Sequence, residues 1–149
     1  MTQDARAFNW DSIPTNTAVT ANPAAGAASQ TLFTVGAGKK RMLVGIYFGY
    51  QADGTAANRY MQLELTDGTG AIGGACSTAL TAGNLGNYSF SVGIGESTSI
   101  SVTGLSIEFF VPLPVLEIPA TGVATIYFRN KQAADDCGVI RYAYKEVPT

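Results

Sequence analysis

The sequence predicts an all-β protein, an antiparallel β-sandwich most consistent with a jelly roll, with an extended N-terminal arm. Short runs of β-branched and aromatic residues recur along most of the chain, separated by Gly, Asn and Asp, as in strands joined by turns. No window of about 12 or more residues has the 3.6-residue period of a helix. About eight to ten such runs are present, and a jelly roll has eight strands in two sheets.

An immunoglobulin-like sandwich is the main alternative. The single tryptophan, Trp10, precedes both cysteines, so the Cys…Trp…Cys order of true immunoglobulin domains is absent. The jelly roll is therefore favoured.

A chain of 149 residues fits one domain. Residues 1–29 are predicted to form the arm, because this stretch is polar, rich in small residues and contains Pro14 and Pro23, which disfavour helix. One short strand is expected within the arm, at 15–20. Residues 30–149 are predicted to form the sandwich.

The first four strands of the sandwich are expected at 31–35, 41–50, 58–66 and 71–77. The second of these has large apolar side chains on both faces, which indicates a central strand. One face carries Met42, Val44, Ile46, Phe48 and Tyr50, and the other carries Leu43, Gly45, Tyr47 and Gly49. The third strand alternates regularly, so Met61, Leu63 and Leu65 are predicted to face the core.

The later strands are expected at 87–92, 97–102, 105–111, 122–130 and 138–146. In the Ser/Thr-rich strand 97–102, Ile100 and Val102 are predicted to face the core, as is Leu105 in the next strand. The last two strands are predicted to pair with each other through the connection 131–137.

Charge and composition exclude several classes of function. Nine Lys and Arg against eleven Asp and Glu leave a net charge of −2, which provides no field to attract nucleic acid or an anionic membrane. Charged residues are only 13%, about half the roughly 25% of an average soluble domain. Histidine is absent, which removes the commonest general base and metal ligand. We expect no catalytic residue, no cofactor and no metal site.

The N-terminus and the cysteines bear on the compartment. The first residues of the chain contain no basic segment followed by an apolar run, so no signal peptide is recognised and synthesis in a cytoplasm is expected. Cys76 and Cys137 are then favoured as reduced thiols, with a disulfide between them as the alternative. The longest apolar stretches are shorter than the ~20 residues of a membrane-spanning helix.

Three polar or aromatic groups are weighed as sites. The adjacent Asp135 and Asp136 precede a glycine and indicate a turn rather than a cation site. The charges of the basic cluster 39–41 are interpreted as keeping a hydrophobic strand from pairing with other chains. The alternative interpretation is that the cluster binds an acidic protein partner. Tyr142 and Tyr144 share one face of the last strand and are the best candidates for a sugar-stacking platform.

The arm contains the candidate partner-binding residues. Phe8, Trp10 and Ile13 are large apolar residues in an otherwise polar segment that cannot offset the entropy of its own ordering. We predict that they dock on a partner. The alternative is that the arm folds back on its own sandwich.

Taken together, the arm 2–29 and the strand 38–46 that opens the sandwich make the chain resemble the decoration, or cement, proteins of tailed-bacteriophage capsids. Low charge and the lack of histidine fit the same resemblance. It implies a non-enzymatic structural protein of the virion, made in the host cytoplasm. The implied partners are the major capsid protein or another virion protein, and further copies of the chain in a dimer or trimer.

Two other functions remain open. One is a carbohydrate- or receptor-binding module of a phage fibre or tail. The other is a small hydrolase, which the residue inventory disfavours because no nucleophile has a histidine partner.

Overall fold

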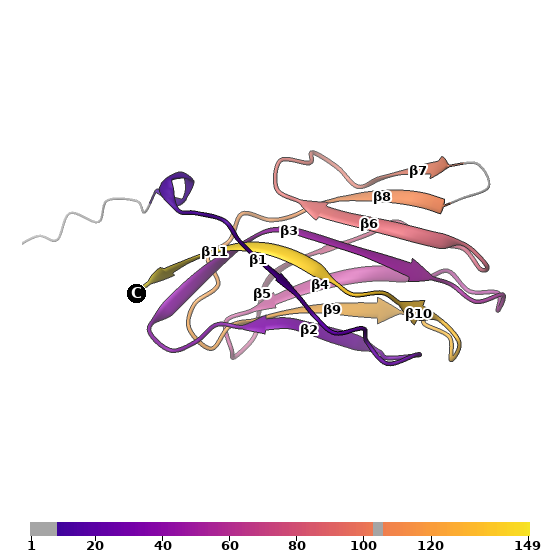
Figure 1. Cartoon of the computed structure of the whole chain (residues 1–149), viewed down its shortest axis with the longest axis horizontal. Helices are drawn as coiled ribbons and strands as arrows, with labels where there is room; N and C mark the ends of the chain where they lie inside the picture. The colour runs from indigo at the N-terminus through magenta and orange to yellow at the C-terminus, as the bar shows by residue number, and fades with distance from the viewer. Residues whose placement is uncertain (1–8, 103–105) are drawn as a thin grey trace, which may run out of the picture.

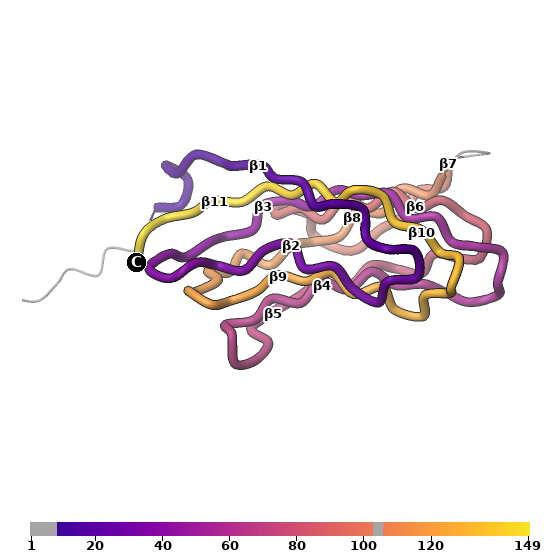
Figure 2. Tube along the Cα trace, turned by 60° about the horizontal axis from the view of Figure 1, so that its bottom comes forward, coloured from indigo at the N-terminus to yellow at the C-terminus, as the bar shows by residue number. Residues whose placement is uncertain are grey.

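The computed structural model describes residues 9–102 and 106–149, which form two β-sheets packed face to face (Figure 1 and Figure 2). A short 3-10 turn, η1 (Trp10–Ser12), precedes the first strand. The strands of the larger sheet are β1 (Asn16–Val19), β3 (Lys39–Gln51), β6 (Leu85–Ser91), β7 (Thr98–Val102), β8 (Ser106–Pro112), β10 (Asp136–Cys137) and β11 (Arg141–Pro148). Those of the smaller sheet are β2 (Ser29–Thr34), β4 (Tyr60–Thr66), β5 (Ala71–Cys76) and β9 (Val123–Arg129).

The order of the strands confirms the predicted sandwich and has the connectivity of a jelly roll. The larger sheet runs β1-β11-β3-β6-β8-β7, with β10 beside β3, and the smaller sheet runs β2-β9-β4-β5. When β7, β8 and β10 are set aside, the first of the remaining strands pairs with the last, the second with the seventh, the third with the sixth and the fourth with the fifth. These ladders are β1–β11, β2–β9, β3–β6 and β4–β5, all antiparallel. One long hairpin wound into two layers produces this nesting.

The strands β7 and β8 add to the larger sheet beyond the eight strands of the jelly roll. β8 is parallel to β6 and antiparallel to β7, so one parallel pair interrupts an otherwise antiparallel sandwich. The larger sheet then has six strands along its path against four in the smaller sheet. β7 consequently lies at the rim with all five residues exposed (Figure 1).

The core is formed by alternate residues of both sheets. The predicted alternation of β4 is confirmed, since every second side chain is buried. Phe48, Tyr88 and Phe109 form a continuous stack across three neighbouring strands, with ring centroids 5.1 Å and 4.5 Å apart. Such stacks of large rings supply much of the apolar area that a sandwich buries.

The prediction for Leu43 is wrong. Leu43 is buried in the same core as Ile46, not on the opposite face. The register of β3 against β11 shifts between Ala143 and Tyr144, and Val44 has no partner in this ladder. This bulge reverses the alternation and turns Leu43 inward.

The prediction for Ile100 and Val102 is also wrong. Ile100 is 58% exposed and Val102 is 38% exposed. Across the sheet Tyr47 is paired with Ser89, Ser89 with Phe110, and Phe110 with Thr98. Side chains of paired residues lie on the same face of a sheet. Thr98, Ile100 and Val102 therefore lie on the outer face with Tyr47. Leu105, also predicted to face the core, lies outside the described residues.

The last two long strands do not pair with each other, contrary to the prediction. β9 lies between β2 and β4, whereas β11 lies between β1 and β3 in the other sheet. The connection between them therefore crosses from one layer to the other. A turn-rich sequence is compatible with either connection, and only the nesting of the strands decides between them.

One strand that precedes β2 is part of the sandwich. The strand expected at 15–20 is present as β1, which pairs with β11 from Asn16 opposite Tyr144 to Val19 opposite Arg141. It is the first strand of the jelly roll. The sandwich therefore includes residues 16–19, which the composition assigns to the arm.

Candidate functional site

Trp10, a predicted partner-binding residue, lies against the chain's own sandwich. Its indole N–H donates to a carboxylate oxygen of Glu117 at 2.8 Å. The Lys145 ammonium donates to the backbone carbonyl of Trp10, also at 2.8 Å. The Lys40 ammonium lies 5.8 Å from the centre of the indole ring, within cation–π range. Polar contacts thus attach the segment around Trp10 to one end of the larger sheet.

The other two predicted residues flank this attachment. Ile13 is half-buried directly after η1, and its N–H donates to the Trp10 carbonyl at 3.1 Å. Phe8 lies outside the described residues. Partner binding by Phe8, Trp10 and Ile13 stays a prediction.

The basic cluster at the start of β3 is matched by carboxylates. Lys39 and Arg41 both pair with Glu146, and Lys40 pairs with Glu117 at 2.9 Å. Hydrogen bonds from Lys39 and Arg41 lower the pKa of Glu146. Because these cations already have anionic partners, the cluster is not a ready phosphate site.

The two tyrosines considered for sugar stacking are not a flat exposed platform. Tyr142 and Tyr144 share one face of β11, as predicted, but that face points between the sheets. Their rings lie 5.6 Å and 6.0 Å from the ring of Phe33 on β2. The guanidinium of Arg41 stacks 4.2 Å from the ring of Tyr144. A sugar therefore cannot reach both faces of this pair without displacing the packing.

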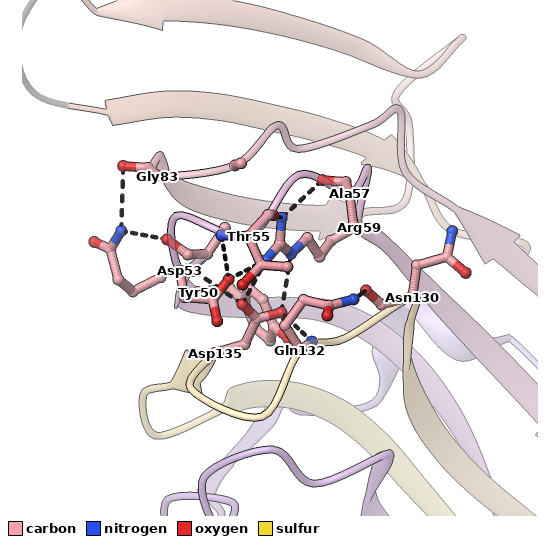
Figure 3. A network of polar contacts seen from close by, with 12 residues as sticks. Tyr50, Asp53, Thr55, Ala57, Arg59, Gly83, Asn130, Gln132 and Asp135 are labelled. Carbon is pink, nitrogen blue, oxygen red and sulfur yellow. Dashed lines mark hydrogen bonds and ion pairs between the residues drawn. The ribbon is translucent and has the colours of Figure 1, made fainter.

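A buried ionic network lies at the other end of β3, between the β3–β4 loop and the β9–β10 loop (Figure 3). Arg59 is 0% exposed. Its Nε and one terminal nitrogen donate to the two oxygens of Asp135 at 3.0 Å and 2.9 Å. The remaining hydrogen bonds go to Asp53 and to the carbonyls of Thr55 and Ala57. All three guanidinium nitrogens are thus engaged.

Asp135 is saturated in the same way. Its carboxylate also accepts hydrogen bonds from the Tyr50 hydroxyl at 3.0 Å and from the amides of Asp53 and Gln132. Burial alone would raise the pKa of this carboxyl, but the hydrogen bonds that it accepts, foremost from Arg59, lower the pKa to about 2. No lone pair remains open for a substrate, so the network is a structural clamp. The turn predicted here is present, but its first aspartate is an internal ion-pair partner.

The outer face of the larger sheet is nearly uncharged. Three rows of residues run across it, as given by the register. They are Val19–Arg141–Tyr47–Ser89–Phe110–Thr98, Thr17–Ala143–Gly45–Ser91–Pro112 and Gly49–Asn87–Glu108–Ile100. Arg141 and Glu108 are the only charged residues in these rows, and Glu108 accepts a hydrogen bond from Asn87 at 2.7 Å. Large apolar side chains on a sheet face with few charges are typical of contact surfaces.

A shallow hollow of about 600 Å³ lies on this face. Its sides include Val19 and the half-exposed ring of Tyr47, and small residues such as Gly45 and Ala143 form part of the floor. A Cβ placed on Gly45 would come no closer than 3.5 Å to another residue, the Phe90 carbonyl oxygen. The space above Gly45 is therefore large enough to receive a side chain from outside.

The outer face of the smaller sheet is different because its side chains satisfy one another. The Arg129 side chain donates to the Gln62 amide oxygen at 2.8 Å and stacks 4.6 Å from the centre of the Tyr127 ring. The Tyr127 hydroxyl lies 3.5 Å from Glu64. This face is polar and already interconnected, so it is a poor surface for apolar contact.

Possible metal ligands and thiols lie apart from one another in the part of the chain that the structure describes. Within 9–102 and 106–149 no three His, Cys, Asp or Glu residues are grouped to hold a metal ion. Cys76 lies exposed on β5 and Cys137 is buried on β10, both as free thiols. Burial raises the pKa of Cys137 to about 12, which disfavours its reactive thiolate. No helix among the described residues is long and apolar enough to cross a membrane.

Comparison of the chain with family models, curated proteins and solved structures gave no match. Functional conclusions therefore rest on the surfaces described above.

The outer face of the larger sheet is not among the surfaces predicted from the sequence. Its signal was present in the two-sided strand 41–50, where Gly45 and Tyr47 alternate opposite the core residues. That pattern identifies a central strand, but it does not tell whether the second face is covered by another layer or is exposed to solvent.

Proposed function

We propose that this chain is a non-enzymatic structural protein that attaches to a protein lattice through the outer face of its larger sheet, as a capsid decoration protein does. The observation that carries the proposal is the face around the hollow, where Tyr47 is 49% exposed beside Gly45 and Ala143 and Arg141 is the one charged residue of the lining. An apolar side chain of a lattice protein would fill the hollow and bury Tyr47.

The absence of long-range charge suits attachment to a repeating surface. Modest single contacts suffice when many copies bind one lattice, because each bound copy also contacts its neighbours and these small energies add. A net charge of −2 produces little repulsion between neighbouring copies.

The segment around Trp10 adds a second contact in this proposal. It lies at one end of the larger sheet and is attached through an exposed hydrogen bond to Glu117 and a partly buried hydrogen bond from Lys145. Such contacts are weak enough to be exchanged for contacts with a lattice protein. Phe8, Trp10 and Ile13 would then extend the attachment beyond the edge of the sandwich.

The sugar-binding alternative has less support. It relied on Tyr142 and Tyr144, and these rings pack against Phe33 and Arg41. Tyr47 is exposed, but a single ring is a small stacking surface.

The test is co-sedimentation with empty shells assembled from a tailed-bacteriophage major capsid protein. We expect the wild-type chain to pellet with the shells and Tyr47→Glu to remain in the supernatant, with binding weakened at least tenfold. The matched control is Val115→Glu, since Val115 is 69% exposed and lies in the loop between β8 and β9, outside the outer-face rows.

Three outcomes would contradict the proposal. They are a wild-type chain that does not pellet, a Tyr47→Glu variant that pellets fully, and a control that is lost as completely as Tyr47→Glu. Binding of the wild-type chain to a glycan array, abolished by Tyr47→Ala, would support the carbohydrate module instead.

A further inference from the structure

β7 is an open edge strand. Its one ladder neighbour within the described residues is β8, and all five of its residues are exposed on both faces of the sheet. Its other edge therefore presents unpaired backbone N–H and C=O groups to solvent. Such groups are a template for another strand.

The usual protection of an edge strand is lacking in β7. Charged residues, prolines, glycines and bulges normally block pairing with another chain, and Thr98–Val102 contains none of these. The other edges of the two sheets are less suitable. The β2 and β5 ladders each contain a register shift, β5 includes Gly73 and Gly74, and β1 has only four residues.

We propose that a second copy of this chain pairs with β7, antiparallel and about a two-fold axis through Ile100. In this register Ile100 faces Ile100 of the other copy, Ser99 faces Ser101, and Thr98 faces Val102. Each strand offers the other a matching surface, apolar and β-branched on one face and hydroxyl-bearing on the other. This self-complementarity is what selects a second copy over an unrelated strand, because an isologous contact needs the same patch to match itself.

The geometry has a consequence for the outer faces. When a residue pairs with its own copy in an antiparallel ladder, both side chains project from the same face, so the two-fold axis is perpendicular to the sheet. The two larger sheets would then form one continuous sheet, with both hollows on the same side. The exposed Ile100 and Val102 would be partly covered by their counterparts.

The contact is small. One five-residue ladder is well below the roughly 800 Å² per partner of a standard interface, so we expect a dissociation constant in the micromolar range or weaker. Dimerisation should therefore depend strongly on concentration. The inference concerns the free chain in solution and does not rest on the proposed attachment to a lattice.

The test is a charge exchange at Ile100, monitored by sedimentation equilibrium of the full chain up to about 1 mM. The wild-type chain should dimerise. Ile100→Glu and Ile100→Lys should each raise the dissociation constant at least tenfold, because like charges then face each other across the axis. An equimolar mixture of the two variants should dimerise again. Val115→Glu should behave as wild type.

Circular dichroism establishes that each variant is folded, which is expected because Ile100 is already exposed. A wild-type chain that stays monomeric throughout the range overturns the proposal. So does a dimer that both variants retain, or a mixture that remains monomeric. Shell binding is measured in a separate assay, so loss of the dimer and loss of lattice attachment can be told apart.

Discussion

The two ends of β3 each carry a cluster of paired basic and acidic side chains, and the two clusters differ in how deeply they are buried. At its start, Lys39, Lys40 and Arg41 meet Glu146 and Glu117 near the surface. At its end, Tyr50 reaches the fully enclosed pair of Arg59 and Asp135. An exposed ion pair contributes little because water and salt screen it, whereas a buried charge that loses its partner is strongly destabilising.

The difference assigns separate roles to the two ends. The enclosed cluster joins the β3–β4 and β9–β10 loops and so fixes one end of the sandwich (Figure 3). The exposed cluster supports the attachment of the Trp10 segment, through Glu117 and Lys145. The end with the enclosed cluster should therefore stay folded, whereas the end with the exposed cluster should release the Trp10 segment under mild conditions.

The largest effect is expected from breaking the enclosed cluster. Asp135→Asn removes the buried anion that pairs with Arg59 and leaves only the partly exposed Asp53 to balance its charge, so we expect the free energy of unfolding to fall by about 3 kcal/mol. The measurement is urea denaturation at neutral pH. Asp136→Asn is the matched control, because this neighbouring carboxylate is exposed, and its effect should lie within about 0.5 kcal/mol. Equal losses in the two variants would contradict a structural clamp.

Acid should weaken the same cluster. The pKa of Asp135 is lowered in the folded state, so its stabilisation is complete above its ordinary pKa and is lost as pH falls from about 4 to about 2. This amounts to about 2 kcal/mol. The hydrogen bonds from Thr69 and Gly70 likewise lower the pKa of the exposed Asp67 to about 2. The contribution of Asp135 to the loss of stability in acid is therefore the difference between wild type and Asp135→Asn when the free energy of unfolding is plotted against pH. Parallel profiles would show that Asp135 does not titrate in this window.

Two truncations test which N-terminal residues the sandwich needs for its stability. Removal of residues 1–14 leaves β1 intact and should change stability little. Removal of residues 1–20 deletes β1 and uncovers the edge of β11, so we expect a further loss of about 1–2 kcal/mol from its missing hydrogen bonds. Thermal unfolding of both truncated chains provides the comparison. If both truncations unfold at the same temperature, β1 contributes no stability to the sandwich.

The smallest effect is expected at the exposed cluster itself. Lys39→Gln removes one surface ion pair with Glu146 and should cost about 0.2–1 kcal/mol, falling towards zero in 1 M salt. Limited proteolysis is the more sensitive measurement, because cleavage between residues 9 and 15 should accelerate in high salt as the Trp10 segment detaches. A rate of cleavage that does not respond to salt would show that apolar packing holds the segment.

The local sequence pattern was sufficient to predict the buried side chains of a strand that packs regularly against the core along its whole length. The alternation in β4 identified its buried side chains correctly, because every second residue meets the same core. It failed at Leu43, where an unpaired residue in the ladder with β11 changes the phase, and at Ile100, which the register through β8 and β6 places on the outer face of the larger sheet. In both cases the pairing between strands decides which side chains face the core.

The candidate sites likewise depend on contacts that a local sequence pattern does not reveal. The sequence identified Asp135 as a turn residue, but the partner that makes it a clamp, Arg59, is 76 residues away. Trp10 is predicted to dock on a partner, and the structure shows its indole donating to Glu117 of the same chain, 107 residues away. Side-chain pairs this distant leave no local pattern.

The sequence by itself determined that the chain is all-β, that it has one core, and that it lacks histidine-based chemistry, because composition and two-residue periodicity are local properties. The tertiary structure decided which strands are neighbours, which face of the larger sheet is left uncovered and which edge stays open. These depend on how a wound hairpin distributes its strands between two layers of unequal width, and a strand's own residues do not encode what lies opposite them.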